Sequence, residues 1–230
     1  MRIIDRLLRR KSAQEPSLSK KKAEPWTQRW AIADQRPAMN DWRLPPGARD
    51  PSVVAAVESG WLVPGSRVLD LGCGDGAVAA YLTGAGFDAV GIDFAPSAIE
   101  RARSQYGDLE RLRFEVADVV SFRDEAFEAL VDRGCYHGLS NKERELYLKT
   151  VLALTRPGSK FLLLNAIKEG RHGERGEQIE EEFIRKSQQL KKQFAPSFEI
   201  EAVERTVING RGDIEDTGSV PAILMRMTRR

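Results

Sequence analysis

The sequence contains few of the residues that would tie it to a metal ion. Among its 230 residues only two are cysteines, Cys73 and Cys135, and they lack the spacing of metal ligands. Two unpaired thiols suit the reducing interior of a cell. We therefore expect a cytoplasmic protein without a bound metal.

Long apolar runs and an excess of one charge are also missing. No run approaches the ~20 apolar residues of a membrane-spanning helix, and the first residues lack the apolar core of a signal peptide. The 36 basic and 34 acidic side chains nearly cancel, which leaves a formal net charge of +2. A nucleic-acid-binding protein generally carries a marked basic patch or excess, so we expect no nucleic-acid partner.

What is present suits one globular domain with additional chain at its N-terminus. Hydrophobic residues make up 41% and charged residues 30% of the chain, a balance typical of a folded domain. We assign residues 1–24 to a basic, weakly ordered leader, residues 25–49 to a tryptophan-rich segment, and residues 50–230 to the main domain. The oligomeric state stays open.

The start of the leader, residues 1–11, has the pattern of an amphipathic helix. Ile3, Ile4, Leu7 and Leu8 fall on one helical face, with arginines beside them. This pattern suits weak contact with an anionic membrane surface. The alternative is a frayed helix or one docked on its own domain, and it is favoured because so short a helix is marginal alone.

From residue 50 onward, segments of strand length alternate with helical segments. The predicted strands are residues 67–71, 88–93, 111–118, 127–132, 160–167, 198–208 and 220–228. Such alternation indicates βαβ units with helices on both faces of a sheet, and the last two strands, with no helix between them, should form an antiparallel hairpin. We predict an α/β fold of the Rossmann-like, doubly wound type, with a mostly parallel seven-stranded sheet and an antiparallel C-terminal hairpin.

The stretch LDLGCGDG, residues 69–76, places three glycines between the first strand and the next helix. Glycine lets the backbone turn sharply or come close to a ligand, and in open α/β sheets ligands bind outside the carboxyl ends of the strands. The spacing also fits the dinucleotide motif G-x-G-x-x-A. The glycines alone therefore leave open a dinucleotide, another nucleoside ligand or a purely structural turn.

Aspartates at neighbouring strand ends favour a nucleoside. Asp93 ends the second strand, where a carboxylate can accept hydrogen bonds from ribose hydroxyls. Asp118 ends the third strand and can accept a hydrogen bond from an adenine amino group. Asp70 and Asp75 flank the glycines, where they would repel a pyrophosphate and suit an ammonium or sulfonium group. Each aspartate alone also fits a helix cap or a turn.

Together these segments resemble the motif series of class I S-adenosylmethionine-dependent methyltransferases. The resemblance rests on VLDLGCGDG, VGIDFAPSAIERAR, FEVADV and LTRPGSKFLLL and covers about residues 50–230. Within that class the chain resembles the thiopurine S-methyltransferase-like and tellurite-resistance-type small-molecule methyltransferases, through Trp26 and Trp30, DWRLPPGARDP and the tripeptide Asp132 to Gly134. The chain differs from these families in CYHGLS, which follows the tripeptide, and in RHGERGEQIEEEFIRKSQQLKKQF. The resemblance places both segments in the region that determines acceptor specificity.

The resemblance implies S-adenosyl-L-methionine as the cofactor. It places Asp70 near the amino group and Asp93 at the ribose, and it places Phe94, Asp118 and Val119 at the adenine. The tryptophans are either a lid over the cofactor or ordinary packing. The residues expected to bind the cofactor are Trp30, Asp70, Gly72, Cys73, Gly74, Asp93, Phe94, Asp118, Val119 and Asp132.

The candidate catalytic residues lie after the fourth strand. His137, with Tyr136, is the candidate base for a hydroxyl or amine acceptor, whereas a partly ionised thiol would need no base. Arg133 can bind an anionic group of the acceptor. The alternatives are a histidine that only packs and an arginine paired with a carboxylate.

The sequence thus predicts a methyltransferase that acts on oxygen, nitrogen or sulfur of a small molecule. The main alternative is a macromolecular methyltransferase acting on RNA or protein, and the near-neutral charge counts against it. A nucleotide-dependent oxidoreductase of the short-chain type would need a Tyr-x-x-x-Lys pair, which the chain lacks. A cofactor-binding protein without catalysis stays open, because methyl transfer needs few dedicated residues.

Overall fold

The computed structural model describes residues 20–32, 43–44, 48–167, 176–209 and 219–230. Its strands are β1 (Arg67–Leu71), β2 (Asp88–Asp93), β3 (Leu112–Val116), β4 (Phe127–Arg133), β5 (Thr155–Ala166), β6 (Phe198–Asn209) and β7 (Ser219–Arg229). Its helices are α1 (Lys20–Ala31), α2 (Pro51–Glu58), α3 (Ala77–Gly84), α4 (Pro96–Tyr106), α5 (Asn141–Ala153) and α6 (Gly176–Phe194), with a short 3-10 helix, η3 (Tyr136–Gly138).

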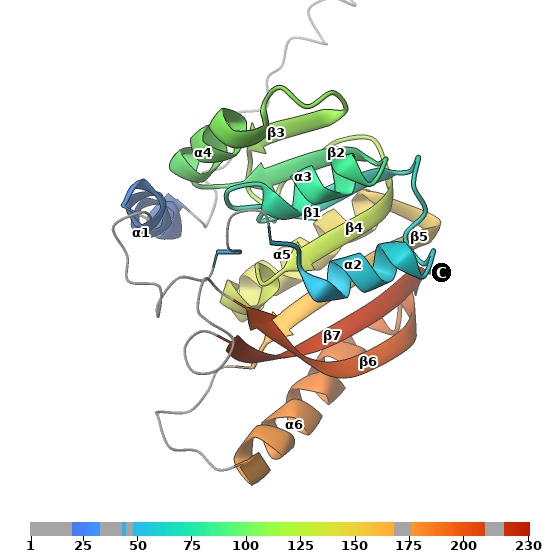
Figure 1. Ribbon diagram of the computed structural model, residues 1–230. Coiled ribbons are helices and arrows are strands. Elements are labelled where there is room, and N and C mark those ends of the chain that lie inside the picture. The colour runs from blue at the N-terminus through green and yellow to red at the C-terminus, as the bar shows by residue number, and fades with distance from the viewer. Residues whose placement is uncertain (1–19, 33–42, 45–47, 168–175, 210–218) are drawn as a thin grey trace, which may run out of the picture.

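The seven strands form one sheet in the order β3-β2-β1-β4-β5-β7-β6 (Figure 1). Strands β1 to β5 are parallel to one another, and β7 lies antiparallel between β5 and β6. The chain order reverses at β1, which leaves a crevice between the ends of β1 and β4. The predicted doubly wound fold with its antiparallel C-terminal hairpin is confirmed.

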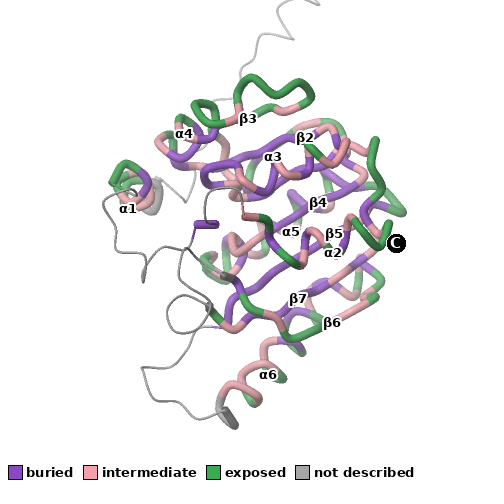
Figure 2. The backbone as a smooth tube through the Cα atoms, in the orientation of Figure 1, coloured by how far each residue is buried: buried purple, intermediate pink, exposed green. Residues whose placement is uncertain are grey.

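Both faces of the sheet are covered, and each carries a core. Alternate residues of a strand point to opposite faces: in β1, Leu69 and Leu71 belong to one core and Val68 to the other. Helices α5 and α6 cover the first face, and α2, α3 and α4 cover the second (Figure 1). Burial on both faces explains why the central strands β1, β2 and β4 read as nearly continuous apolar runs, and Figure 2 shows these strands as largely buried.

Local signals fix where two helices begin. The side chain of Asp50 accepts hydrogen bonds from the backbone N–H groups of Ser52 and Val53, and Pro51 takes the first helical position of α2. Helix α5 begins with a capping box, in which Ser140 and Glu143 exchange hydrogen bonds between side chain and backbone. These caps hold the two helix starts beside the crevice.

Helix α1 is the main element that the sequence did not predict. It crosses the expected boundary between the leader and the tryptophan-rich segment and contains Pro25, which disfavours a helical interior. Tertiary contacts hold it, because Trp30 is buried against Ala95 and Ala98 near the start of α4, where Ser97 donates to the carbonyl of Thr27 at 2.7 Å.

The amphipathic pattern of residues 1–11 lies outside the described residues. Within the part of the chain that the structure describes, none of the helices combines the length and the apolar character that crossing a bilayer requires.

Candidate functional site

A pocket lies at the carboxyl ends of β1, β2 and β4, where the sequence predicted a ligand. It encloses about 1100 Å³ of empty space, including the part open to solvent. The predicted cofactor residues Trp30, Asp70, Gly72, Cys73, Gly74, Asp93, Phe94, Asp118 and Val119 all line this first pocket. So do His137 and Arg133, whereas Asp132 and Tyr136 do not.

The glycine turn forms a wall that leaves no room for side chains. Gly72 and Gly74 have φ angles of 72° and 56°, a left-handed conformation that glycine adopts without strain. A Cβ added at Gly74 would lie 2.6 Å from Cζ2 of Trp30, and one at Gly72 would lie 2.7 Å from Cβ of Cys135. The backbone itself, with Trp30 packed against it, therefore borders the pocket.

Asp70 places an unpaired carboxylate oxygen at the end of β1. The residue is only 2% exposed, and its Oδ2 is buried without a hydrogen-bond partner among the described residues. Burial and, to a smaller extent, nearby Asp132 raise the pKa of Asp70 to about 8, although Arg133 opposes the shift. In its ionised form this buried group is stabilised by a cationic hydrogen-bond donor, and the ammonium group of a ligand would supply one.

Asp93 ties the glycine turn to the end of β2. Its Oδ2 accepts a hydrogen bond from the backbone N–H of Gly74 at 3.1 Å, and its Oδ1 accepts one from Ala95 at 2.9 Å. Burial raises the pKa of Asp93 to about 6, and these backbone hydrogen bonds limit the rise. The carboxylate is mostly ionised near neutral pH and keeps lone pairs that can accept from hydroxyl groups.

Asp118 was predicted to end the third strand, but β3 ends at Val116 and Asp118 lies in the turn that follows it. Its Oδ1 accepts a hydrogen bond from the backbone N–H of Val120 at 3.1 Å, which shapes the turn that follows the strand. Val119 is buried in that turn. The two residues therefore present a carboxylate and an apolar surface to the same end of the first pocket.

Asp132 lies beneath the pocket and holds the turn after β4. Its carboxylate accepts hydrogen bonds from the backbone N–H of Cys135 at 2.7 Å and from the Tyr147 hydroxyl at 2.6 Å. Burial raises its pKa to about 6, while these hydrogen bonds oppose the shift. The structure gives this side chain a supporting position.

Tyr136 also points away from the first pocket. Its hydroxyl donates a hydrogen bond to Gln193 of α6, and burial raises its pKa to about 12. A proton held this firmly makes Tyr136 a poor base. His137, the next residue of η3, does line the pocket, and the other histidine of the chain, His172, lies outside the described residues.

Arg133 reaches the pocket while it is paired with a helix cap. Its Nε donates to Oδ2 of Asp50 at 2.7 Å, and both side chains are mostly buried. The same carboxylate caps α2, so the guanidinium is fixed relative to that helix. Of the two alternatives for Arg133, the ion pair with a carboxylate is present.

Cys73 and Cys135 are free thiols that line the pocket. Burial and neighbouring aspartates raise the pKa of each thiol well above its ordinary value. The thiols are therefore protonated near neutral pH and are poor nucleophiles.

Several residues that line the pocket were not among the predicted site residues, namely Arg43, Leu44, Gly134, Leu139 and Glu143. Arg43 and Leu44 are buried, but they lie in an irregular segment whose sequence has no periodic signal. The capping motif Ser-x-x-Glu could have located Glu143, because it marks the start of a helix directly after the catalytic candidates.

Comparison with known proteins indicates the kind of domain in which this pocket lies. Residues 68–158 match the family model described as "Methyltransferase domain". Over 135 residues the chain is 33% identical to the 2-heptyl-1-hydroxyquinolin-4(1H)-one methyltransferase of Mycobacteroides abscessus. The aligned region covers 57% of this chain and 58% of that protein. The chain carries a class I S-adenosylmethionine-dependent methyltransferase domain. The methyltransferase class and its cofactor, both predicted from the sequence, are confirmed.

Solved structures extend the likeness in fold to most of the chain. One, described as "Conversion of a Disulfide Bond into a Thioacetal Group during Echinomycin Biosynthesis", has a TM-score of 0.70 and 25% identity and covers 90% of this chain and 92% of its own. The Burkholderia thailandensis 1,6-didemethyltoxoflavin-N1-methyltransferase, solved with S-adenosylhomocysteine, shares the fold at a TM-score of 0.61 and 20% identity, over 90% of this chain and 87% of its own. The chain spans less than two thirds of the length of the curated relative from M. abscessus.

Proposed function

We propose that the protein transfers a methyl group from S-adenosylmethionine to a hydroxyl or N–H group of a small aromatic metabolite. The observation that carries the proposal is the unpaired, buried oxygen of Asp70 at the end of β1, in a pocket that the predicted cofactor residues line. A macromolecular acceptor is the alternative, and the nearly balanced charge does not favour RNA.

The residues of the pocket suit each part of the cofactor. Asp70 would accept from the amino group of the methionine part, and Asp93 from the ribose hydroxyls. Phe94 would lie on one face of the adenine, with Asp118 and Val119 at its edge. Gly72, Cys73 and Gly74 would border the methionine part, and Trp30 would close the pocket behind Gly74.

The acceptor side is defined by the turn after β4. The relative from M. abscessus is named for a hydroxylated quinolinone, and an acceptor of that kind suits the apolar surface of Leu139 and Leu44 beside His137. His137 is the one side chain there whose ordinary titration lies near neutral pH. We assign to it the removal of the acceptor proton.

The chemistry requires little beyond orientation and proton removal. S-adenosylmethionine supplies a methyl group that is already activated by its sulfonium. The pocket then has to align the acceptor atom, and orientation can contribute about 7–11 kcal/mol in favourable cases. Asp132, beneath η3, positions the turn that presents His137. The free thiols accord with a cytoplasmic location, which forms part of the proposal.

Asp93→Ala should weaken binding of S-adenosylhomocysteine by about 1.5–3 kcal/mol, the range for a lost charge-assisted hydrogen bond. Isothermal titration calorimetry with the wild type should also show one site and no binding of NAD. Asp88, at the opposite end of the same strand, provides the matched control, and Asp88→Ala should bind as the wild type does. NAD binding, or unchanged affinity in Asp93→Ala, would contradict the cofactor assignment.

Asp70→Asn should stabilise the cofactor-free protein and weaken cofactor binding. The pKa of Asp70 rises from 3.8 to about 8 on folding, so between these pH values the folded protein binds more protons than the unfolded chain and its stability falls as the pH rises. Asparagine does not ionise, so Asp70→Asn does not lose stability in this way as the pH rises. At pH 8 we expect the Tm of Asp70→Asn to exceed that of the wild type by at least about 2–4 °C, because a gain of about 1 kcal/mol shifts the Tm of a chain of this length by that amount. At pH 5 the difference in Tm should be smaller.

The same variant tests the role of the charge. Wild-type affinity for S-adenosylhomocysteine should rise between pH 6 and pH 8 as Asp70 ionises, whereas the affinity of Asp70→Asn should be lower and lack that rise. Equal pH dependence in the two proteins would remove Asp70 from the cofactor site.

A further inference from the structure

A second cavity adjoins the first pocket across η3. It holds about 950 Å³ of empty space, including the part open to solvent. His137, Gly138 and Leu139 line both spaces. The start of α5, the end of β5 and residues of α6 complete its wall, so the two spaces meet at η3.

The walls of the second cavity carry positive charge and amide groups. Arg144 and Lys186 line it, and no aspartate or glutamate does among the described residues. Lys186 forms an ion pair with Glu182 on the same helix at 3.4 Å. The amides come from Asn141, Asn165, Gln189 and Gln193. This combination suits an anionic group that also forms hydrogen bonds.

Asn165 supplies a buried acceptor without a donor. It lies at the carboxyl end of β5, is 5% exposed, and its Nδ2 donates to the neighbouring carbonyl of Ala166 at 3.3 Å. Its Oδ1 is buried without a hydrogen-bond partner among the residues described. An unpaired amide oxygen in a wall is costly in the free protein and becomes satisfied when a ligand brings an N–H or O–H group.

Arg144 of α5 is held against η3. Its guanidinium lies 4.9 Å from the centre of the Tyr136 ring, and Nη2 donates to the carbonyl of His137 at 3.4 Å. Its Nε is buried without a partner within the described part of the chain. The cation is therefore held next to the residue that we assign as the base, with donor capacity left for an anion.

We infer that the second cavity binds an anionic group of the acceptor, a carboxylate near an N–H or O–H donor, while the methyl-accepting atom lies on the His137 side. Arg144 binds the carboxylate, and Oδ1 of Asn165 accepts from the donor. This inference rests on the proposed function and narrows its substrate class to aromatic acids.

Two probes that differ by one carboxylate test the inference. 4-Hydroxyquinoline and 4-hydroxyquinoline-2-carboxylate are titrated into the full-length protein by calorimetry, with and without S-adenosylhomocysteine. The wild type should bind 4-hydroxyquinoline-2-carboxylate at least about tenfold more tightly than 4-hydroxyquinoline, a difference in binding free energy of about 1.4 kcal/mol. Arg144→Gln should reduce this preference to about threefold or less, whereas Asn165→Ala should weaken binding of both probes by about tenfold, because both carry the N–H or O–H donor.

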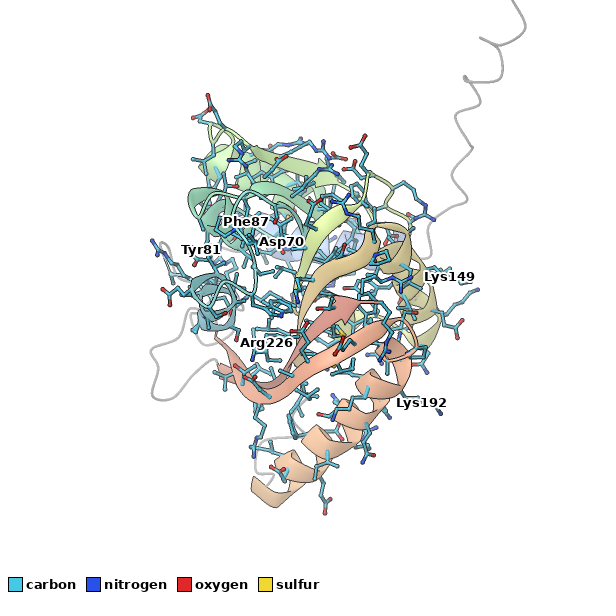
Figure 3. All side chains as sticks on the ribbon, turned by 90° about the vertical axis from the view of Figure 1, so that its right-hand side faces the viewer. Asp70, Tyr81, Phe87, Lys149, Lys192 and Arg226 are labelled. Atoms are coloured by element: carbon cyan, nitrogen blue, oxygen red, sulfur yellow. The ribbon has the colours of Figure 1, made fainter. Side chains whose placement is uncertain are left out.

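Control variants show whether the preference depends on the residues of the second cavity or on the overall positive charge of the protein. Lys192→Gln removes a positive charge from the exposed side of α6 (Figure 3) and should keep the full preference. Arg144→Lys, which retains the charge, should keep part of it. Thermal unfolding of each variant establishes that the fold is intact.

The outcomes separate this inference from the proposed function. Equal affinity of the two probes for the wild type, no binding of the carboxylate probe at millimolar concentration, an unchanged preference in Arg144→Gln, or unchanged affinities in Asn165→Ala would overturn the inference. S-adenosylhomocysteine binding is measured separately, and its failure would overturn the proposed function. The probes still test the cavity in the cofactor-free protein, because its walls contain no cofactor atom.

Discussion

Gly74→Val is expected to abolish cofactor binding and leave the domain folded. Gly74 has a φ of 56°, and a Cβ there would lie 2.6 Å and 2.9 Å from two ring atoms of Trp30. Valine would therefore displace that ring into the pocket or occupy the space itself. We expect the Kd for S-adenosylhomocysteine to rise by about 10³-fold or more, a loss of about 4 kcal/mol.

Gly84 offers a matched control for this substitution. It ends α3, and an added Cβ would meet nothing within 4 Å. Gly84→Ala should therefore bind the cofactor as the wild type does. Calorimetry gives the affinities, and circular dichroism shows whether each variant is folded. A folded Gly74→Val protein with affinity near that of the wild type would mean that the turn is structural only.

His137→Ala should reduce turnover by about 10²–10⁴-fold and leave cofactor affinity intact, because a positioned base contributes about that factor. His137 lines both the first pocket and the second cavity, so it lies where an acceptor would enter. The pH–rate profile of the variant should also lose the limb that a histidine produces near neutral pH.

Tyr136→Phe separates the base from its neighbour. The Tyr136 hydroxyl donates to Gln193 outside the first pocket, and its pKa is raised to about 12, so its loss should change turnover by less than about tenfold. If His137→Ala keeps the pH profile of the wild type and a similar rate, His137 is not the base. A thiol acceptor would produce that result, because its thiolate forms without help.

Local patterns were sufficient to predict the fold. The strands β1 and β2 begin and end where the sequence placed them. Strands buried on both faces leave continuous apolar runs, and Pro51 and Pro96 mark the first positions of two helices. The parallel order then brings Asp70 and Asp93 to one edge of the sheet, which is why motif spacing located the pocket.

Local sequence patterns did not predict the contacts between segments that are distant in the sequence. Nothing near Trp30 in the sequence shows that its ring closes over Gly74. Arg133 pairs with Asp50, which is 83 residues away. Asp132 and Tyr136 belong to the predicted turn, but the direction of their side chains depends on partners in α5 and α6. The second cavity likewise forms only when α6 packs beside η3.

Transfer of a labelled methyl group tests the central claim most directly. The full-length protein is incubated with S-adenosylmethionine labelled in its methyl group and a pool of small metabolites, RNA and protein, and the fractions are separated and analysed by mass spectrometry. We expect the label in a small aromatic acid, and the same experiment with Gly74→Val should give none. Label in RNA or protein alone, or no transfer to any fraction, would contradict the proposed function.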